Sequence, residues 1–214
     1  MTEMTVPLFR LCLVTDRKSV NNGLLEIISE AVEGGVDAVQ IRENDLSAKE
    51  IYEMVLQVRE VVKDRAKIIV NDRIDAAVSA GADGVHLGWK SIPLDKAVEI
   101  AKRFSLFVGI SCHSIGEVIE AKQKDADYVS LGPIYETPSK KGILLPLGLE
   151  EIKKVKDRVN IHLTAIGGIE ESNCDKVIKA GADAVSVIRA IQQADAPYES
   201  AKRLRRIIGQ CSKY

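Results

Sequence analysis

The sequence predicts a (β/α)8 barrel of the TIM-barrel class, formed by residues 1–214 as a single domain. Short apolar segments alternate eight times with segments whose apolar residues recur at helical spacing, which indicates a buried parallel sheet covered by helices. A motif repeated four times before alternate strands supports the same fold. An open doubly wound sheet is the alternative, but eight regular strand-helix units favour closure into a barrel.

The predicted strands are at residues 9–16, 38–42, 67–72, 84–88, 107–112, 128–134, 161–168 and 184–188. The predicted helices lie at 23–35, from Ser47 onward, at 73–81, 94–104, 115–125, about 149–159, between the last two strands, and at 198–211. Ser47 and Glu50 form a capping box, and Ser114 caps the helix that begins at 115. Residues 188–190 open a further short helix.

The repeated motif places an aspartate in the turn that leads into the second, fourth, sixth and eighth strands. These residues are Asp37, Asp83, Asp127 and Asp183, and in three of the four repeats a glycine ends the preceding helix. The third interval between the aspartates is the longest, mainly because of a long loop after the sixth strand, at about residues 135–147. Long loops in compact domains are usually functional.

The composition excludes several classes of function. Thirty basic and 31 acidic residues give a net charge of −1, which argues against general affinity for nucleic acid or anionic membranes. Four scattered cysteines have neither disulfide-framework nor zinc-ligand spacing, and are interpreted as small buried side chains. No signal peptide or membrane span is recognisable, so a cytoplasmic protein is expected.

Barrel chemistry takes place at the carboxyl ends of the strands, where this sequence has several cations and few carboxylates. That balance suits small phosphate and diphosphate substrates. The polar residues expected there include Thr15, Asp16, Gln40, Arg42, Asn44, Asn71, Asp72, Ser91, Ser111, His113, Thr137, Ser139, Lys140, Lys141 and Arg189.

Three of these residues have a specific candidate role. Asp72, beside Asn71, is a candidate ligand for Mg²⁺ bridging a diphosphate, or alternatively the N-cap of the next helix. Arg42 is a candidate bidentate phosphate ligand, or alternatively a surface partner of Glu43 or Asp45. His113 is a candidate general acid-base, or alternatively a loop histidine bonded to the backbone.

The long loop and the last two strand ends are candidate anion sites. Thr137, Ser139, Lys140 and Lys141 offer hydroxyl and ammonium groups to a diphosphate, although a solvated loop would have a similar composition. Gly167 and Gly168 allow close approach of a phosphate to the backbone, and residues 188–190 offer free N–H groups. His86 and His162, within strands, are interpreted as structural.

Seven short motifs occur in order along the chain: Leu-Val-Thr-Asp, Gln-Ile-Arg-Glu, Val-Asn-Asp-Arg, Gly-Val-His-Leu-Gly, Gly-Ile-Ser-Cys-His-Ser, Asp-Tyr-Val-Ser-Leu-Gly-Pro-Ile-Tyr-Glu-Thr and Ala-Ile-Gly-Gly-Ile. Together they resemble the motifs of thiamin phosphate synthase and its TenI relatives. The resemblance implies coupling of hydroxymethylpyrimidine diphosphate to thiazole phosphate, with release of diphosphate and use of Mg²⁺. It implies that Gln40, Arg42 and Asn71 bind the pyrimidine diphosphate, and that Asp72 binds Mg²⁺. Ser111 and Lys140 would contact the diphosphate, and Thr137, Ser139, Gly168, Ile188 and Arg189 the thiazole phosphate.

The sequence departs from the synthase pattern at Asn44, where the family has lysine, and at Ser91, where it has the second metal-binding aspartate. Lys90, next to Ser91, is a candidate replacement charge. A milder change is Ser139 in the Thr-x-Thr-Lys motif. Two alternatives therefore stay open beside the synthase: a TenI-type thiazole tautomerase with His113 as acid-base, and a non-catalytic barrel that binds a phosphate ligand.

Overall fold

The computed structural model describes residues 8–20, 23–137 and 144–211. Eight parallel strands form a closed barrel in which each strand pairs with its sequence neighbours and β8 pairs with β1. The strands are β1 (Leu11–Val14), β2 (Ala38–Ile41), β3 (Lys67–Asn71), β4 (Gly84–Leu87), β5 (Phe107–Cys112), β6 (Tyr128–Leu131), β7 (His162–Ile166) and β8 (Ala184–Val187). The predicted (β/α)8 barrel is confirmed.

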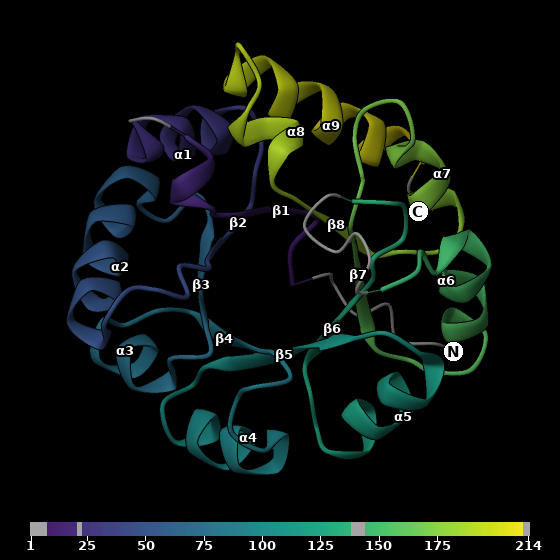
Figure 1. The fold of residues 1–214 in the computed structure, drawn as a ribbon, viewed down its shortest axis with the longest axis horizontal. Coiled ribbons are helices and arrows are strands. Elements are labelled where there is room, and N and C mark those ends of the chain that lie inside the picture. The colour runs from purple at the N-terminus through teal and green to yellow at the C-terminus, as the bar shows by residue number, and fades with distance from the viewer. Residues whose placement is uncertain (1–7, 21–22, 138–143, 212–214) are drawn as a thin grey trace.

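An outer ring of helices surrounds the strands (Figure 1). Its members are α1 (Leu24–Glu33), α2 (Ala48–Val62), α3 (Ile74–Ser79), α4 (Leu94–Arg103), α5 (Ile115–Gln123), α6 (Gly148–Lys156), α7 (Cys174–Lys179), α8 (Arg189–Gln192) and α9 (Pro197–Cys211), with a 3-10 turn η1 (Arg17–Ser19) after β1. The capping box of Ser47 and Glu50 and the cap at Ser114 both form as predicted. None of the described helices is long and apolar enough to cross a membrane.

The four repeated aspartates join neighbouring strands at their amino ends. Each carboxylate accepts a hydrogen bond from a backbone N–H near the start of the preceding strand: Asp37 from Leu11, Asp83 from Ile68, Asp127 from Val108 and Asp183 from Leu163, at 2.7–2.8 Å. A left-handed residue precedes each aspartate by two positions: Gly35, Gly81, Asp125 and Gly181. The repeated motif therefore links neighbouring strands at the amino ends of the barrel, away from the end where barrel chemistry takes place.

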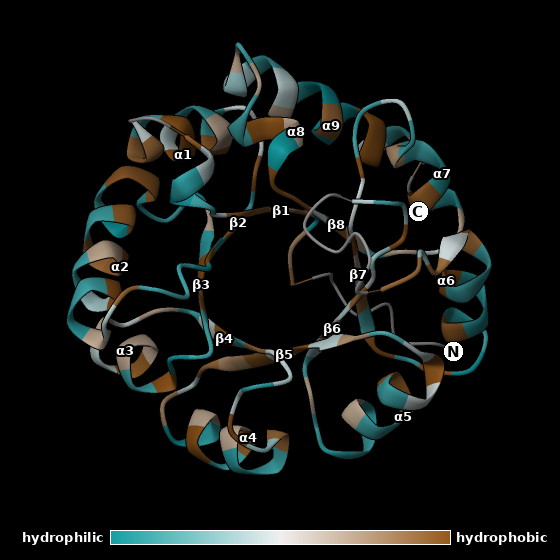
Figure 2. Ribbon diagram, viewed as in Figure 1, coloured by the Kyte–Doolittle hydropathy of each residue, from teal (hydrophilic) through white to brown (hydrophobic). Residues whose placement is uncertain are grey.

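The apolar residues form two layers, one between strands and helices and one inside the barrel. Figure 2 shows hydrophobic residues along the strands and hydrophilic residues over much of the helical rim. The layer inside the barrel contains Phe9, Cys12, Ile69 and Tyr128, all buried. The four cysteines are free thiols, and Cys12, Cys112 and Cys174 are buried, as predicted. This filled interior leaves the carboxyl ends of the strands as the open end of the barrel.

Candidate active site

A cavity of about 1650 Å³ lies at the carboxyl ends of the strands. Of the residues predicted for this site that the structure describes, all except the buried Thr15 line it: Asp16, Gln40, Arg42, Asn44, Asn71, Asp72, Ser91, Ser111, His113, Thr137, Gly168, Ile188 and Arg189. They come from the ends of different strands, because parallel strands in a barrel end at one face. Ser139, Lys140 and Lys141 lie outside the described residues.

Asp72 is held in place by three hydrogen-bond donors from neighbouring segments. Asn71 Nδ2 donates to its Oδ2 at 2.8 Å, while Gly88 N, at 3.2 Å, and the Ser91 hydroxyl donate to Oδ1. The backbone of Asp72 is left-handed, with φ 61°. The prediction that Asp72 caps the next helix is wrong: the N-cap of α3 is Arg73, and no side chain caps it.

The residues around Asp72 fit a Mg²⁺ ion that takes most of its ligands from substrate and water. The carboxylate offers about four lone-pair positions, and its three donors leave one for a metal. Among the described residues no group of three or more His, Cys, Asp or Glu side chains could hold a metal by itself. Mg²⁺ is usually bound through one or two carboxylates together with substrate phosphates, so a single aspartate is compatible with it.

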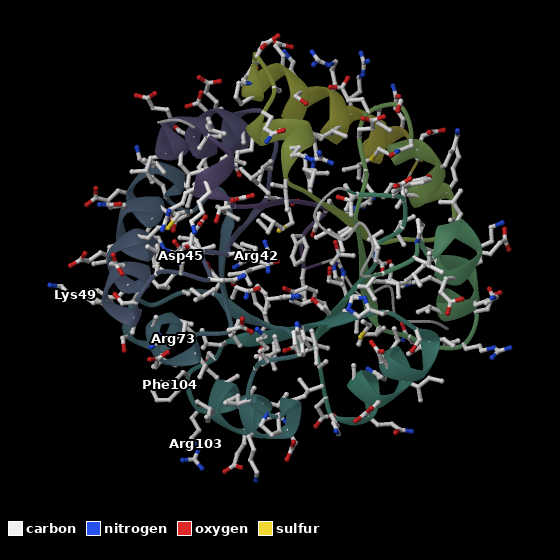
Figure 3. The ribbon with its side chains drawn as sticks, in the orientation of Figure 1. Arg42, Asp45, Lys49, Arg73, Arg103 and Phe104 are labelled. Atoms are coloured by element: carbon white, nitrogen blue, oxygen red, sulfur yellow. The ribbon has the colours of Figure 1, made fainter. Side chains whose placement is uncertain are left out.

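Arg42 brings a positive charge to the same side of the cavity. Its predicted alternative partners are engaged elsewhere: Glu43 accepts from the Thr15 hydroxyl at 2.6 Å and Asp45 from Arg17 at 2.5 Å. Within the part of the chain that the structure describes, the Arg42 guanidinium makes no ion pair. Figure 3 places Arg42 inside the ring of helices. The surface-pair alternative is therefore wrong, and the cation is available to an anion.

The expectation of few carboxylates at this end of the barrel is also wrong. Among the described residues that line the cavity, acidic side chains outnumber basic ones; they are Asp16, Glu43, Asp72, Glu117, Glu120, Glu136 and Glu170. Several are occupied by neutral or cationic donors within the protein. Glu43 binds Thr15 and Arg17, Glu117 accepts from the backbone N–H of His113 at 2.7 Å, and Glu120 pairs with Lys124.

His86 connects the barrel interior to the cavity, which the sequence interpretation did not anticipate. The ring is 3% exposed; its Nδ1 lies 2.8 Å from the Tyr128 hydroxyl and its Nε2 2.9 Å from Ser111 Oγ. Burial lowers the pKa of His86 to about 4, so the ring is neutral near pH 7. The strand register explains this contact, because His86 pairs with Gly109, and Ser111, two residues on, points to the same face. A single sequence does not show that register.

His113 lies at the end of β5 with one ring nitrogen engaged. Nδ1 donates to the Gly132 carbonyl, so Nε2 is the unprotonated nitrogen of the neutral ring. Among the described residues Nε2 has no hydrogen-bond partner. The backbone-bonded alternative is thus observed, and it also leaves Nε2 as a base at the cavity wall.

The opposite side of the cavity is formed by backbone after β7 and β8. Gly167 and Gly168 have φ of 99° and 65°. A Cβ on Gly168 would lie 2.7 Å from both the Glu136 carbonyl oxygen and Tyr135 Cβ, so close packing on the loop after β6 also requires glycine there. The N–H groups of Gly168, Ile188 and Arg189 have no backbone acceptor in the described segments. They form a potential anion site.

A family model described as thiamine monophosphate synthase matches residues 11–191. The chain belongs to this family. The resemblance predicted from the seven motifs is therefore confirmed. The matched segment of this chain contains every residue that lines the cavity except Gln193.

Named relatives support the family assignment over nearly the whole chain. A thiamine-phosphate synthase of Clostridium acetobutylicum is 41% identical over 196 residues, covering 91% of this chain and 92% of the relative. One of Clostridium novyi is 38% identical, covering 93% and 98%. The solved structure of a thiamine phosphate pyrophosphorylase from Pyrococcus furiosus matches with a TM-score of 0.86 at 34% identity, covering 95% and 96%. These names favour the synthase over the tautomerase and the non-catalytic barrel.

Proposed function

We propose that this chain is a thiamine-phosphate synthase, which joins hydroxymethylpyrimidine diphosphate to thiazole phosphate and releases diphosphate. Family membership supports the reaction, and one structural observation supports the proposal that it takes place in the cavity at the carboxyl ends of the strands. Arg42, which makes no ion pair with a described residue, lines the same cavity as the carboxylate of Asp72 and the N–H groups of Gly168 and Arg189, so two anionic substrates can bind side by side.

The diphosphate would bind on the side of β2 to β5. Gln40 Nε2 donates to Asn71 Oδ1 at 2.9 Å, and Asn71 in turn donates to Asp72, so the three side chains orient one another. Asp72 would hold Mg²⁺, with the Ser91 hydroxyl beside it. When bound, Mg²⁺ neutralises charge on the diphosphate leaving group. Arg42 and the Ser111 hydroxyl would bind oxygens of the same diphosphate, and Lys140 would add a further contact from the loop.

Departure of diphosphate from the pyrimidine methylene carbon builds negative charge on the leaving group and positive charge on the ring. Groups fixed in advance against the leaving group stabilise that separation more than they stabilise the substrate. Arg42 meets this requirement because no carboxylate of the described residues competes for it. The thiazole nitrogen then forms the new bond to the methylene carbon.

The thiazole phosphate would bind to the backbone N–H groups of Gly168, Ile188 and Arg189, with Thr137 and Ser139 contributing from the long loop. This placement sets the second substrate across the cavity from Asp72. The bound phosphate would orient the thiazole so that the thiazole nitrogen faces the pyrimidine. Holding both substrates in this way makes the coupling resemble an intramolecular reaction.

The test is release of diphosphate from the two purified substrates, measured with and without Mg²⁺. Turnover that depends on both substrates and on Mg²⁺ is expected. Arg42→Gln should lower kcat/KM by about 100-fold or more, because a charged hydrogen-bond donor to the leaving group is lost. Arg103→Gln is the matched control, since Arg103 extends from the outer rim and pairs with Glu99 (Figure 3). Absence of turnover at every Mg²⁺ concentration would refute the proposal.

A further inference from the structure

A hydrogen-bonded chain inside the barrel ends at the candidate site. His86 in β4, Gly109 in β5 and Tyr128 in β6 are neighbours in the strand register. Gly109 leaves room between the other two, because a Cβ at this position would lie 2.0 Å from the Tyr128 ring. The phenol therefore extends across β5 to Nδ1 of His86, and the other ring nitrogen contacts Ser111 at the cavity wall.

The burial of Tyr128 fixes the direction of the protons in this chain. The side chain is 1% exposed, and burial raises its pKa well above the ordinary value, so the hydroxyl keeps its proton. Among the described residues, His86 Nδ1 is the one hydrogen-bond partner of that hydroxyl. A buried donor without an acceptor is destabilising. Tyr128 therefore donates to Nδ1, and the proton of the neutral His86 ring resides on Nε2.

We propose that His86 is a positioning residue whose Nε2–H donates to Ser111 Oγ and thereby turns the Ser111 hydroxyl proton toward an anionic oxygen in the cavity. A hydroxyl that accepts one hydrogen bond still has its own proton to donate, and the accepted bond polarises it. The anion is the diphosphate of the proposed function, on which this role of Ser111 rests.

The opposite tautomer would have the opposite consequence. With the proton on Nδ1, Ser111 would donate to Nε2 and present only lone pairs to the cavity. Those lone pairs would repel a phosphate oxygen, and the Tyr128 proton would have no acceptor. The two arrangements of the same three side chains therefore predict either an anion-binding or an anion-repelling serine.

The tautomer can be measured on the unmodified protein. The chain has three histidines, so long-range ¹H–¹⁵N spectra of ¹⁵N-histidine-labelled protein are simple, and His86→Gln assigns the relevant ring. We expect the pattern of a neutral ring protonated on Nε2. A ring protonated on Nδ1, or on both nitrogens near pH 7, would overturn the proposal. This measurement requires neither turnover nor ligand.

The action of His86 through Ser111 is tested by a double-mutant cycle on calorimetric binding of inorganic diphosphate with Mg²⁺. Ser111→Ala and His86→Leu should each weaken binding roughly tenfold, and the double variant should bind no more weakly than Ser111→Ala alone. His86→Gln, which places an amide N–H donor near the Nε2 position, should restore binding to within about threefold. His162→Leu is the matched control, because His162 is a half-buried strand histidine that has no hydrogen bond to Ser111 among the described residues.

Independent, additive effects of the two substitutions would overturn the positioning role, because a merely structural histidine would weaken binding with or without Ser111. A wild-type chain that binds no inorganic diphosphate would instead count against the proposed function and the anion role of Ser111. In that case the tautomer spectrum still decides the direction of the hydrogen-bonded chain.

Discussion

Replacing Ser91 by aspartate should convert the proposed Mg²⁺ site from one carboxylate to two. The Ser91 hydroxyl donates to Asp72 Oδ1, so a carboxylate at this position would face Asp72 directly. Two unit charges about 4 Å apart repel by about 4 kcal/mol at an effective dielectric of 20. Solvent in the open cavity screens part of this, leaving about 1–2 kcal/mol of destabilisation without metal. For a chain of this size that lowers Tm by roughly 2–8 °C.

Mg²⁺ should reverse the effect. A second carboxylate adds a ligand charge, and Mg²⁺ affinity in the absence of substrates should rise at least tenfold. Saturation at about 100 times Kd then returns about 2.7 kcal/mol of stability. The assay is thermal melting with and without Mg²⁺, together with calorimetric titration. Ser91→Asn is the matched control of equal size without the charge. Equal Mg²⁺ affinity in the two variants would refute the assignment of this corner as the metal site.

Three further predictions concern stability. Gly168→Ala should cost about 2–5 kcal/mol in denaturant unfolding, because its left-handed backbone and crowded Cβ direction exclude a side chain, whereas Gly209→Ala, with open space in α9, should stabilise slightly. Asp183→Asn should cost about 1–3 kcal/mol in the same assay, since this carboxylate binds a β7 N–H and a lysine. His86 and His162 have folded pKa values lowered to about 4 by burial, so their contribution to stability should be complete above pH 6.5 and be lost as pH falls to 4, measured as Tm against pH.

The barrel could be predicted from sequence because its determinants are local. In each strand-helix unit the spacing of apolar residues indicates the strand and the helix. In the repeated motif, an aspartate such as Asp37 accepts a hydrogen bond from the preceding strand and so links the two strands. The ends of the strands were predicted less well. Strand β1 was expected at residues 9–16 and is Leu11–Val14, because the turn after it is held by contacts to Glu43 and Gln192, far along the chain.

The candidate site was predicted as a set of positions, but not as a set of contacts. The rule that parallel strands end at one face is sufficient to bring Arg42 and Asp72 to one cavity. It does not determine side-chain partners. The bond between His86 and Ser111 depends on strand register and on the space that Gly109 leaves for Tyr128, which a single sequence does not display. The left-handed backbone at Asp72 is not marked by a glycine.

The two sides of the cavity respond differently to sequence change because they use different groups. The side after β7 and β8 offers backbone N–H groups, which depend on the course of the chain and survive most substitutions. The other side relies on individual side chains, and both major departures from the synthase pattern, Asn44 and Ser91, fall there. Lys90, beside Ser91, also lines the cavity, and its Nζ lies 4.9 Å from the centroid of the exposed Trp89 ring. In the proposed function, Arg42 would contribute a positive charge to the diphosphate and Asp72 would hold the Mg²⁺ that neutralises it, so among the described residues these two should be the most sensitive positions of the cavity.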